Sequence, residues 1–302
     1  MDARAGAGGS GSRVPVGARR QGSRRGAGRR RAGVSTLQAT GVERLAEAFA
    51  STGKRAALMP YLMAGFPTLE CSLRIGEACI EAGADVIELG VPYSDPLADG
   101  PVIHAAGTVA LAAGANVAGV LEVARALASR IPVVLMCYAN MVFAPGVDAF
   151  VERLARTGAC GLIVPDLPEG EGPEVRAACE RTGLALVALV APTTTPERMA
   201  AIGERAQGFL YTVSVVGTTG ERRTLDESFA DVVAKAKACT RVPVALGFGI
   251  ATPEQAAQAA DAGADGVIVG TRLVRAAGEA EDPAAAVGAL VSELAAGLAR
   301  AS

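Results

Sequence analysis

Short apolar runs alternate, from Thr40 onward, with longer segments in which apolar residues recur at helical spacing. The runs are rich in Val, Ile and Leu and apolar on both faces, which is typical of parallel strands covered by helices. The eight runs begin near Ala57, Val86, Val133, Gly161, Ala185, Phe209, Pro243 and Gly266. This alternation predicts a parallel sheet whose strands are joined by crossover helices.

One short pattern recurs at three of these runs. It reads EAGADVIELG at residues 81–90, RTGACGLIVP at 156–165 and DAGADGVIVG at 261–270. Each copy joins the end of a helix, a Gly in the position after the helix, and a buried strand. Eight such units in a body close to the roughly 250 residues of a (β/α)8 TIM barrel favour that fold over its main alternative, an open doubly wound sheet.

Two of the repeated units are enlarged. The starts of successive runs lie 47 residues apart after the second run and 34 after the sixth, against 23 to 29 elsewhere. Extra length in a barrel usually belongs to the loops that follow strands, and these loops form the active face. We therefore expect enlarged loops after strands 2 and 6, with the chemistry beside them.

The start of the chain has a different composition. Residues 1–33 consist mainly of Gly, Ala and Arg, with nine Arg and a single acidic residue, Asp2. With so few large apolar side chains, this segment cannot offset the entropy cost of ordering. We expect residues 1–36 to form a disordered tail and residues 37–302 to form a single catalytic barrel domain. A transit peptide and a start codon placed too far upstream are the alternatives for the tail.

Composition narrows the class of function. The tail carries a net charge of about +8, which leaves about −10 on the rest of the chain, and the sequence has no Trp and four Tyr. An acidic body with few aromatic side chains lacks the basic groove and stacking surfaces of a nucleic-acid-binding protein. The longest uncharged run, residues 100–121, is half Gly and Ala, so we expect neither a membrane span nor a membrane partner.

Cysteine and histidine usage argues against a thiol or imidazole metal cluster. The six Cys include no C-x-x-C pair, and His104 is the only histidine. In a domain of this size, such spacing is typical of buried free thiols in a reducing compartment. We therefore expect a cytoplasmic protein without a metal site.

A carboxylate interrupts the second run. Alternation along VIELG, residues 86–90, places Glu88 on the face opposite Ile87 and Leu89, and the flanking runs contain no Lys or Arg. An unpaired buried carboxyl has a raised pKa, which suits a group that gives and takes protons near neutral pH. The alternative is a structural Glu that hydrogen-bonds loop amides or a Tyr. Asp99, in the following loop, is either a second site carboxylate or a turn-forming residue.

Glycines follow the last three runs. GFLYTVSVVGTTGER at 208–222 and PVALGFGI at 243–250 end in Gly-rich loops, and DGVIVGTRLV at 265–274 turns through Gly270 and Thr271 into a helical segment. Bare amides and a helix N-terminus at the ends of adjacent strands form the recurrent phosphate site of barrels. These residues predict a phosphorylated ligand.

Five segments of the chain are distinctive when taken together. They are ELGVPYSDPLADGP at 88–101, PYLMAGFPT at 60–68, LMCYANMVF at 135–143, GLIVPDLP at 161–168 and GFGIATPEQ at 247–255. These five segments resemble the tryptophan synthase α chain family. The likeness extends over residues 42–298, and the first segment is highly specific. The resemblance implies a lyase of tryptophan biosynthesis that cleaves indole-3-glycerol phosphate to indole and glyceraldehyde 3-phosphate in a retro-aldol reaction. It also implies that this chain has no cofactor and passes indole through a tunnel to a pyridoxal-phosphate β chain in an α2β2 assembly.

The resemblance assigns roles position by position. It makes Glu88 the general acid and base, Asp99 the carboxylate that accepts the indole N–H, and Thr219 the loop residue that closes over Asp99. The positions that shape the apolar indole pocket and its hydrogen bonds are Tyr61, Tyr138, Ile163, Tyr211 and Phe248. The positions at the phosphate site are Gly220, Gly249, Gly270 and Thr271.

Some positions depart from the residues usual in the family. Phe66 stands where an acidic residue is frequent, and His104 stands where Gln is common. Val215 and Val216 stand where more polar residues are usual. These departures bear on loop closure and partner contacts more than on the chemistry.

The residue inventory also constrains the mechanism. The only lysines, Lys54, Lys235 and Lys237, lie away from the C-terminal ends of the predicted strands, where a Schiff base would form. Acid–base catalysis by carboxylates is therefore the mechanism that the residues favour over a Schiff base. Two alternative functions stay open. One is another sugar-phosphate barrel enzyme, although such an enzyme would not need the motif at residues 88–101. The other is a catalytically silent subunit that binds a phosphorylated ligand and activates a β-type partner.

Overall fold

The computed structural model describes residues 39–213, 228–247 and 249–300. The chain from Ala39 onward forms one unit. The predicted tail, residues 1–36, lies outside the described residues, so its disorder stays a prediction.

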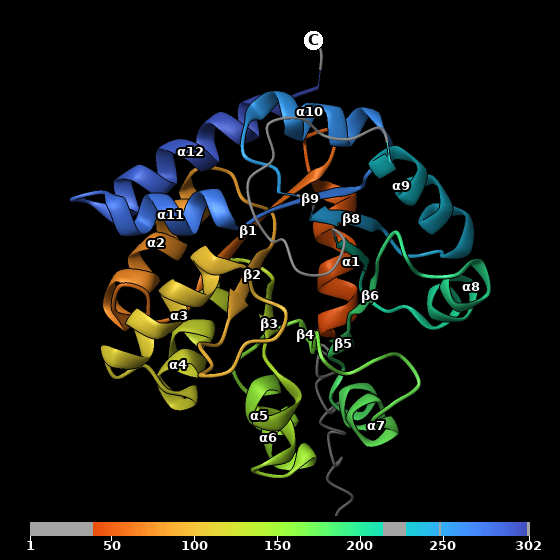
Figure 1. Ribbon diagram of the computed structural model, residues 1–302, viewed down its shortest axis with the longest axis horizontal. Coiled ribbons are helices and arrows are strands. Elements are labelled where there is room, and N and C mark those ends of the chain that lie inside the picture. The colour runs from red at the N-terminus through yellow and green to blue at the C-terminus, as the bar shows by residue number, and fades with distance from the viewer. Residues whose placement is uncertain (1–38, 214–227, 248, 301–302) are drawn as a thin grey trace, which may run out of the picture. The chain divides into compact units, whose positions relative to one another are not determined.

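Nine parallel strands form a ring in the described part of the chain (Figure 1). They are β1 (Ala57–Met63), β2 (Ile87–Gly90), β3 (Val133–Met136), β4 (Gly161–Ile163), β5 (Ala185–Leu186), β6 (Ala188–Val190), β7 (Leu210–Val213), β8 (Val244–Gly247) and β9 (Gly266–Val269). β5 and β6 are the two halves of the fifth predicted run, interrupted at Val187, and they pair with β4 and β7 respectively. That run therefore closes the ring, which confirms the TIM barrel and excludes an open sheet.

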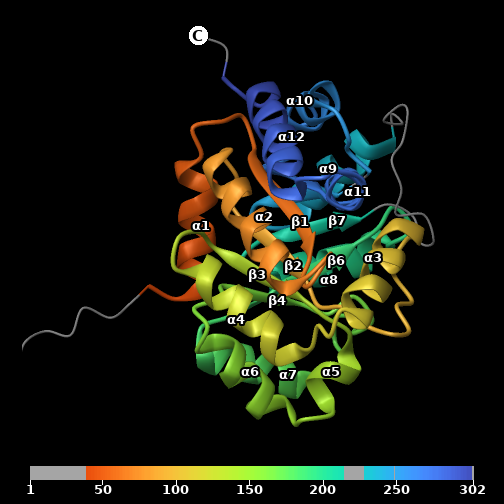
Figure 2. The ribbon, with the colours of Figure 1, turned by 90° about the vertical axis from the view of Figure 1, so that its left-hand side faces the viewer.

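Helices surround the ring of strands (Figure 2). In the described residues they are α1 (Gly41–Ser51), α2 (Leu69–Glu81), α3 (Pro101–Ala112), α4 (Val117–Ala128), α5 (Ala139–Phe143), α6 (Val147–Ala155), α7 (Pro173–Thr182), α8 (Pro196–Arg205), α9 (Ser228–Cys239), α10 (Pro253–Asp261), α11 (Thr271–Glu279) and α12 (Pro283–Gly297). Thr40 forms a capping box with Glu43 at α1, and Asn116 caps α4. Pro occupies the first turn of α3, α7, α8, α10 and α12, where its missing N–H costs no hydrogen bond.

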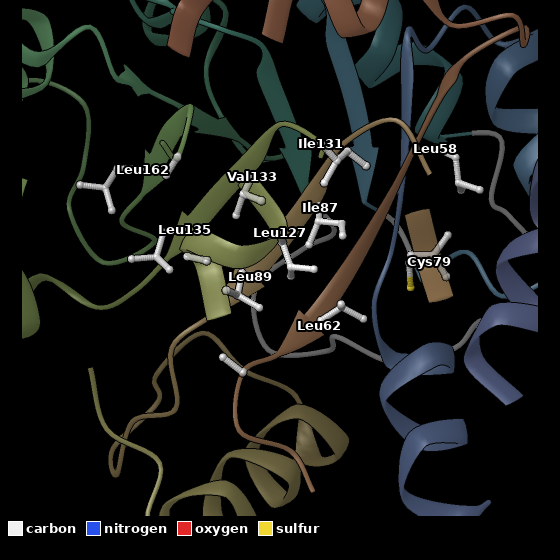
Figure 3. Packing of buried hydrophobic residues seen from close by; sticks show 14 of the residues in the cluster. Leu58, Leu62, Cys79, Ile87, Leu89, Leu127, Ile131, Val133, Leu135 and Leu162 are labelled. Carbon is white, nitrogen blue, oxygen red and sulfur yellow. The ribbon is translucent and has the colours of Figure 1, made fainter. Parts of the chain in front are cut away.

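Alternate positions along each strand build two separate cores. Ile87 and Leu89 point out of the barrel toward the helices and belong to the larger cluster, part of which is drawn in Figure 3. Met59 and Tyr61, from β1, belong to a smaller cluster inside the barrel. Glu88 lies between Ile87 and Leu89, so it faces the interior as the alternation predicts.

The first helix, α1, covers one end of the barrel. Leu45 is completely buried in the interior cluster, and the ring centroids of Phe49 and Phe209 lie 5.7 Å apart. The Arg44 guanidinium donates to the Gly158 carbonyl oxygen at 2.6 Å, just ahead of β4. Because α1 closes the N-terminal end, the C-terminal ends of the strands are left for the site.

The long spacing after the second strand holds an extra helix. Both α3 and α4 lie between β2 and β3, and residues 91–100 connect β2 to α3. The segment after β7 falls mostly outside the described residues. The enlarged loop after strand 6 therefore stays a prediction.

Within the described ranges, no single helix combines the length and the apolar character needed to cross a membrane. By length and composition alone, α3 and α4 meet that test as a pair, with a bend of 108° between them.

Candidate active site

Glu88 occupies the middle of β2 and points into the barrel. Its neighbours across the sheet are Tyr61 on β1 and Val134 on β3. The side chain is completely buried, and neither carboxyl oxygen has a hydrogen-bond partner among the described residues. In the described part of the chain, no loop amide or Tyr hydroxyl donates a hydrogen bond to this carboxyl, as the alternative of a structural Glu would require.

The surroundings of Glu88 change its protonation. Burial, followed by the negative charge of Asp99, raises the pKa of Glu88 from 4.5 to about 8. At neutral pH the carboxyl is therefore mainly protonated and can donate a proton. A pKa near neutrality also lets the same group take a proton back within one catalytic cycle.

Asp99 ends the loop between β2 and α3, one residue before the N-cap of the helix. Partial burial raises the pKa of the Asp99 carboxyl, whereas a hydrogen bond from the Tyr138 hydroxyl and the charge of His104 oppose that rise. The Tyr138 hydroxyl oxygen also accepts from the Ala98 amide at 3.0 Å. Tyr138, which follows β3, thus fixes this loop at the mouth of the barrel.

Two glycines make room for two tyrosine rings inside the barrel. A Cβ atom on Gly90 would lie 2.2 Å from the Tyr61 hydroxyl oxygen, and a Cβ atom on Gly247 would lie 2.7 Å from that of Tyr211. Burial, followed by the charges of nearby carboxyls, raises the pKa of both phenols, so both stay protonated. Sequence reasoning missed both glycines, although each occupies the last inward-facing position of its strand.

Six of the predicted residues come together at the C-terminal end of the barrel. Ile163, at the end of β4, is completely buried in the interior cluster. Tyr138 stacks on Tyr93, with ring centroids 5.1 Å apart. The six residues are Glu88, Asp99, Tyr61, Tyr138, Ile163 and Tyr211.

Three predicted phosphate-site residues follow neighbouring strands. Gly249, after β8, has a φ of +71°, a left-handed conformation that Gly adopts without strain. Gly270, after β9, is the N-cap of α11, whose first residue is the buried Thr271. Amides of the first helical turn, together with the helix dipole, can bind a phosphate at this position.

The remaining predicted site residues are Thr219, Gly220 and Phe248. They lie outside the described residues, as do Val215 and Val216. Their roles therefore stay predictions.

Two departures from the family's usual residues do lie in the described ranges. Phe66 is half-buried, and a Cβ atom on Gly278 of α11 would lie 3.0 Å from its ring. Phe66 therefore replaces a frequent acidic side chain with an apolar contact to α11. His104 is exposed in the first turn of α3, where its charge reaches Asp99.

Two of the three lysines lie away from this site. Lys54 and Lys237 form ion pairs with Asp85 and Asp265, at 2.9 and 2.7 Å, and these aspartates precede β2 and β9. Both lysines therefore lie at the N-terminal end of the barrel, away from the C-terminal strand ends, which agrees with the prediction for these two lysines. All six cysteines are free. Across the described residues, no three His, Cys, Asp or Glu side chains are grouped so that they could hold a metal ion.

Comparison with known proteins gives one consistent answer. The family model for the tryptophan synthase alpha chain matches residues 48–301. The tryptophan synthase alpha chain of Methanosarcina acetivorans is 46% identical over 245 residues, which cover 81% of this chain and 89% of the relative. That of Gloeobacter violaceus is 47% identical over 246 residues, which cover 80% of this chain and 88% of the relative.

Solved structures show the same fold. A chain of Mycobacterium tuberculosis tryptophan synthase superposes with a TM-score of 0.81 at 42% identity, covering 87% of this chain and 100% of that chain. A chain of the tryptophan synthase a2b2 complex from Pyrococcus furiosus superposes with a TM-score of 0.76 at 35% identity, covering 80% and 98%. The present chain therefore belongs to the tryptophan synthase alpha chain family.

Proposed function

We propose that this chain cleaves indole-3-glycerol phosphate to indole and glyceraldehyde 3-phosphate, the α reaction of tryptophan synthase, with Glu88 and Asp99 as its two working carboxyls. Membership of the tryptophan synthase alpha chain family supports the reaction. One observation carries the residue assignment. Glu88 is completely buried, lacks a hydrogen-bond partner among the described residues, and has a pKa raised to about 8.

Glu88 moves the protons. Its neutral carboxyl gives a proton to C3 of the indole ring, and the ring becomes an indolenine whose positive nitrogen attracts electrons. The Glu88 carboxylate then takes the proton from the hydroxyl on the side-chain carbon next to the ring. As the bond between that carbon and C3 breaks, its electron pair returns to the ring and the carbon becomes an aldehyde. Glu88 ends the cycle protonated, ready for another substrate.

Asp99 acts on the ring nitrogen. Its carboxylate accepts the indole N–H and stabilises the positive charge that grows on the nitrogen when C3 is protonated. The Tyr138 hydrogen bond and the charge of His104 favour the ionised form of Asp99 against the effect of burial. A partly buried, fixed anion stabilises such a charge more than an anion in water does.

The other assigned residues hold the substrate. Tyr61, Tyr138, Ile163 and Tyr211 line the indole end, and Gly249, Gly270 and Thr271 bind the phosphate after β8 and β9. The positions of these residues around Glu88 and at the start of α11 support this division. Thr219, Gly220 and Phe248 complete the site on the strength of the family resemblance alone.

The proposed partner is a tryptophan synthase β chain in an α2β2 assembly. The relative from Pyrococcus furiosus was solved as an a2b2 complex whose subunits activate each other. In the loop that carries Asp99, Leu97 is 85% exposed, so a partner that docks at this loop could bury its apolar side chain. Pyridoxal phosphate belongs to the β chain in this proposal, and this chain works without a cofactor. Its free cysteines suit a reducing compartment, so we place it in the cytoplasm.

The direct test is to incubate the purified chain with indole-3-glycerol phosphate, with and without a β chain, and to measure both products. We expect indole and glyceraldehyde 3-phosphate in equal amounts, formed faster with the β chain present. Binding of the substrate without indole release in either condition would indicate a silent subunit. Conversion of other sugar phosphates without indole release would indicate a different barrel enzyme.

A further inference from the structure

We propose that Tyr61 is a positioning residue of the α reaction, whose hydroxyl donates a hydrogen bond to the Glu88 carboxylate whenever Glu88 has given up its proton. The inference rests on the proposed function, because it supplies a partner for the proton carrier of that reaction. It goes further by giving the Tyr61 hydroxyl a role separate from that of its ring in the pocket wall.

Tyr61 and Glu88 are direct neighbours on β1 and β2, and both point into the barrel. The Tyr61 hydroxyl lies over Gly90, since a Cβ atom there would be 2.2 Å from its oxygen. Gly90 is the next inward-facing position after Glu88, roughly 7 Å further along the same strand. Rotation about the side-chain bonds of Glu88 therefore brings its carboxyl within reach of this hydroxyl.

The Glu88 carboxyl needs a hydrogen-bond donor when it is ionised. Neither of its oxygens has a hydrogen-bond partner among the described residues, which costs little while the group is neutral and much more once it is charged. Within the described residues, the charged or titratable groups that act on Glu88 or on Tyr61 are Asp99, Tyr138 and Tyr211, and His104 acts on Asp99. Among these groups, Asp99 is negatively charged and repels the Glu88 carboxylate. The groups that can donate a hydrogen bond to that carboxylate are therefore the tyrosine hydroxyls.

Tyr61 is better placed than Tyr211 to donate to Glu88. The Tyr211 hydroxyl lies beside Gly247 of β8, whereas the Tyr61 hydroxyl lies over Glu88's own strand. The charges of both Asp99 and Glu88 act on the Tyr61 hydroxyl, so Tyr61 lies close to both carboxyls. Burial and these two negative charges raise the pKa of Tyr61 well above its ordinary value. Its hydroxyl therefore keeps its proton and remains a donor at every pH at which the enzyme works.

The test is Tyr61→Phe, which removes the oxygen and keeps the ring. With the β chain present, kcat and KM for indole-3-glycerol phosphate are measured from pH 6 to pH 10. We expect kcat at pH 7 to fall by about tenfold or more, as for loss of a hydrogen bond to a charged group, with KM within about twofold. The alkaline limb of kcat/KM, which reports loss of the Glu88 proton, should move up by about one pH unit, because the ionised form has lost its donor.

The matched control is Tyr93→Phe, which removes a hydroxyl from the neighbouring loop and should leave kcat and the pH profile unchanged. A folded Tyr61→Phe enzyme whose alkaline limb stays in place would overturn the proposal, whatever happens to KM. If that variant fails to fold, 3-fluorotyrosine at position 61 keeps the ring and makes the hydroxyl a stronger donor. It should move the limb to lower pH, and an unmoved limb would again overturn the proposal. Activity of Glu88→Gln is the separate test of the proposed function, so the two failures are distinguishable.

Discussion

At the scale of single residues, the site depends on one carboxyl group in a buried position that disfavours its ionised form. Glu88 is completely buried and its oxygens have no partner in the described part of the chain. The burial that makes Glu88 a proton donor at neutral pH also makes its ionised form costly to the fold. Catalysis and stability are therefore linked through the protonation of one group.

This link predicts a pH-dependent difference between the parent chain and Glu88→Gln. Below the ordinary Glu pKa of 4.5, both the folded and the unfolded states bind the proton, so the residue adds no pH dependence. Between 4.5 and about 8, only the unfolded state releases the proton, and the parent chain loses stability as the pH rises. Across this range, the free energy of unfolding of the variant should rise relative to that of the parent by up to about 1.4 kcal/mol for each pH unit.

The measurement is urea unfolding of both proteins at intervals from pH 5 to pH 9. Glu122→Gln is the matched control, because Glu122 sits in an exposed ion pair with Arg125 and should follow the parent curve. Stability curves of the parent and Glu88→Gln that run parallel over the whole range would show that the Glu88 pKa is not raised.

Which residues could be foreseen depends on whether their environment is local. Alternation and the absence of nearby Lys or Arg are local facts, and they were enough to predict that Glu88 lies on the face opposite Ile87 and Leu89 without a cation partner in the sheet. The contact between Tyr61 and Gly90 depends on the register of β1 against β2, which the sequence does not show. The hydrogen bond between Tyr138 and Asp99 likewise joins a strand end to a loop 39 residues away.

At the scale of elements, the fit of α1 against the barrel determines how the N-terminal end is closed. A Cβ atom on Gly41 would lie 2.3 Å from the Cys160 carbonyl oxygen, so the first turn of α1 packs directly on backbone ahead of β4. A backbone atom cannot rotate away as a side chain can. Any added side chain must therefore push the helix off the barrel.

We predict that Gly41→Ala destabilises the fold by about 1–3 kcal/mol. Gly53→Ala is the matched control, because a Cβ atom on Gly53 would meet nothing within 4 Å. It should change the stability by no more than about 0.5 kcal/mol. The free energy of unfolding of each variant, from urea titration, checks the prediction. Equal stabilities for the two variants would show that α1 does not pack closely on this part of the barrel.

Periodicity predicted the elements well, because each strand is a short apolar run between helical segments. It did not predict that the fifth run divides between β5 and β6, since that division reflects a change of pairing partner from β4 to β7. It also left the extra length after β2 as a loop, whereas much of it forms α3. That helix is rich in Ala, and its apolar residues mark no clear face.

At the scale of the whole molecule, charge is distributed unevenly along the chain. Residues 1–33 carry nine Arg and one acidic residue, although the whole chain has a net charge of −2. These residues have no apolar periodicity with which to dock on a barrel. The family model begins only at residue 48, so the tail has no counterpart in that match.

We predict that deletion of residues 1–33 leaves both the melting temperature and the rate of indole release unchanged. Thermal unfolding and the indole assay, run on the full and the shortened chain under the same conditions, test this. A clear drop in melting temperature on deletion would show that the tail packs on the folded part.

The central claim is that Glu88 is the proton carrier of indole-3-glycerol phosphate cleavage, and the rate of indole release by Glu88→Gln tests it most directly. The amide keeps the volume of the side chain but cannot give and take a proton, so kcat should fall at least about 100-fold while the protein stays folded. Glu122→Gln, measured beside it, should release indole at the parent rate. A folded Glu88→Gln protein that releases indole at nearly the parent rate would contradict the account and assign the proton transfer to another group.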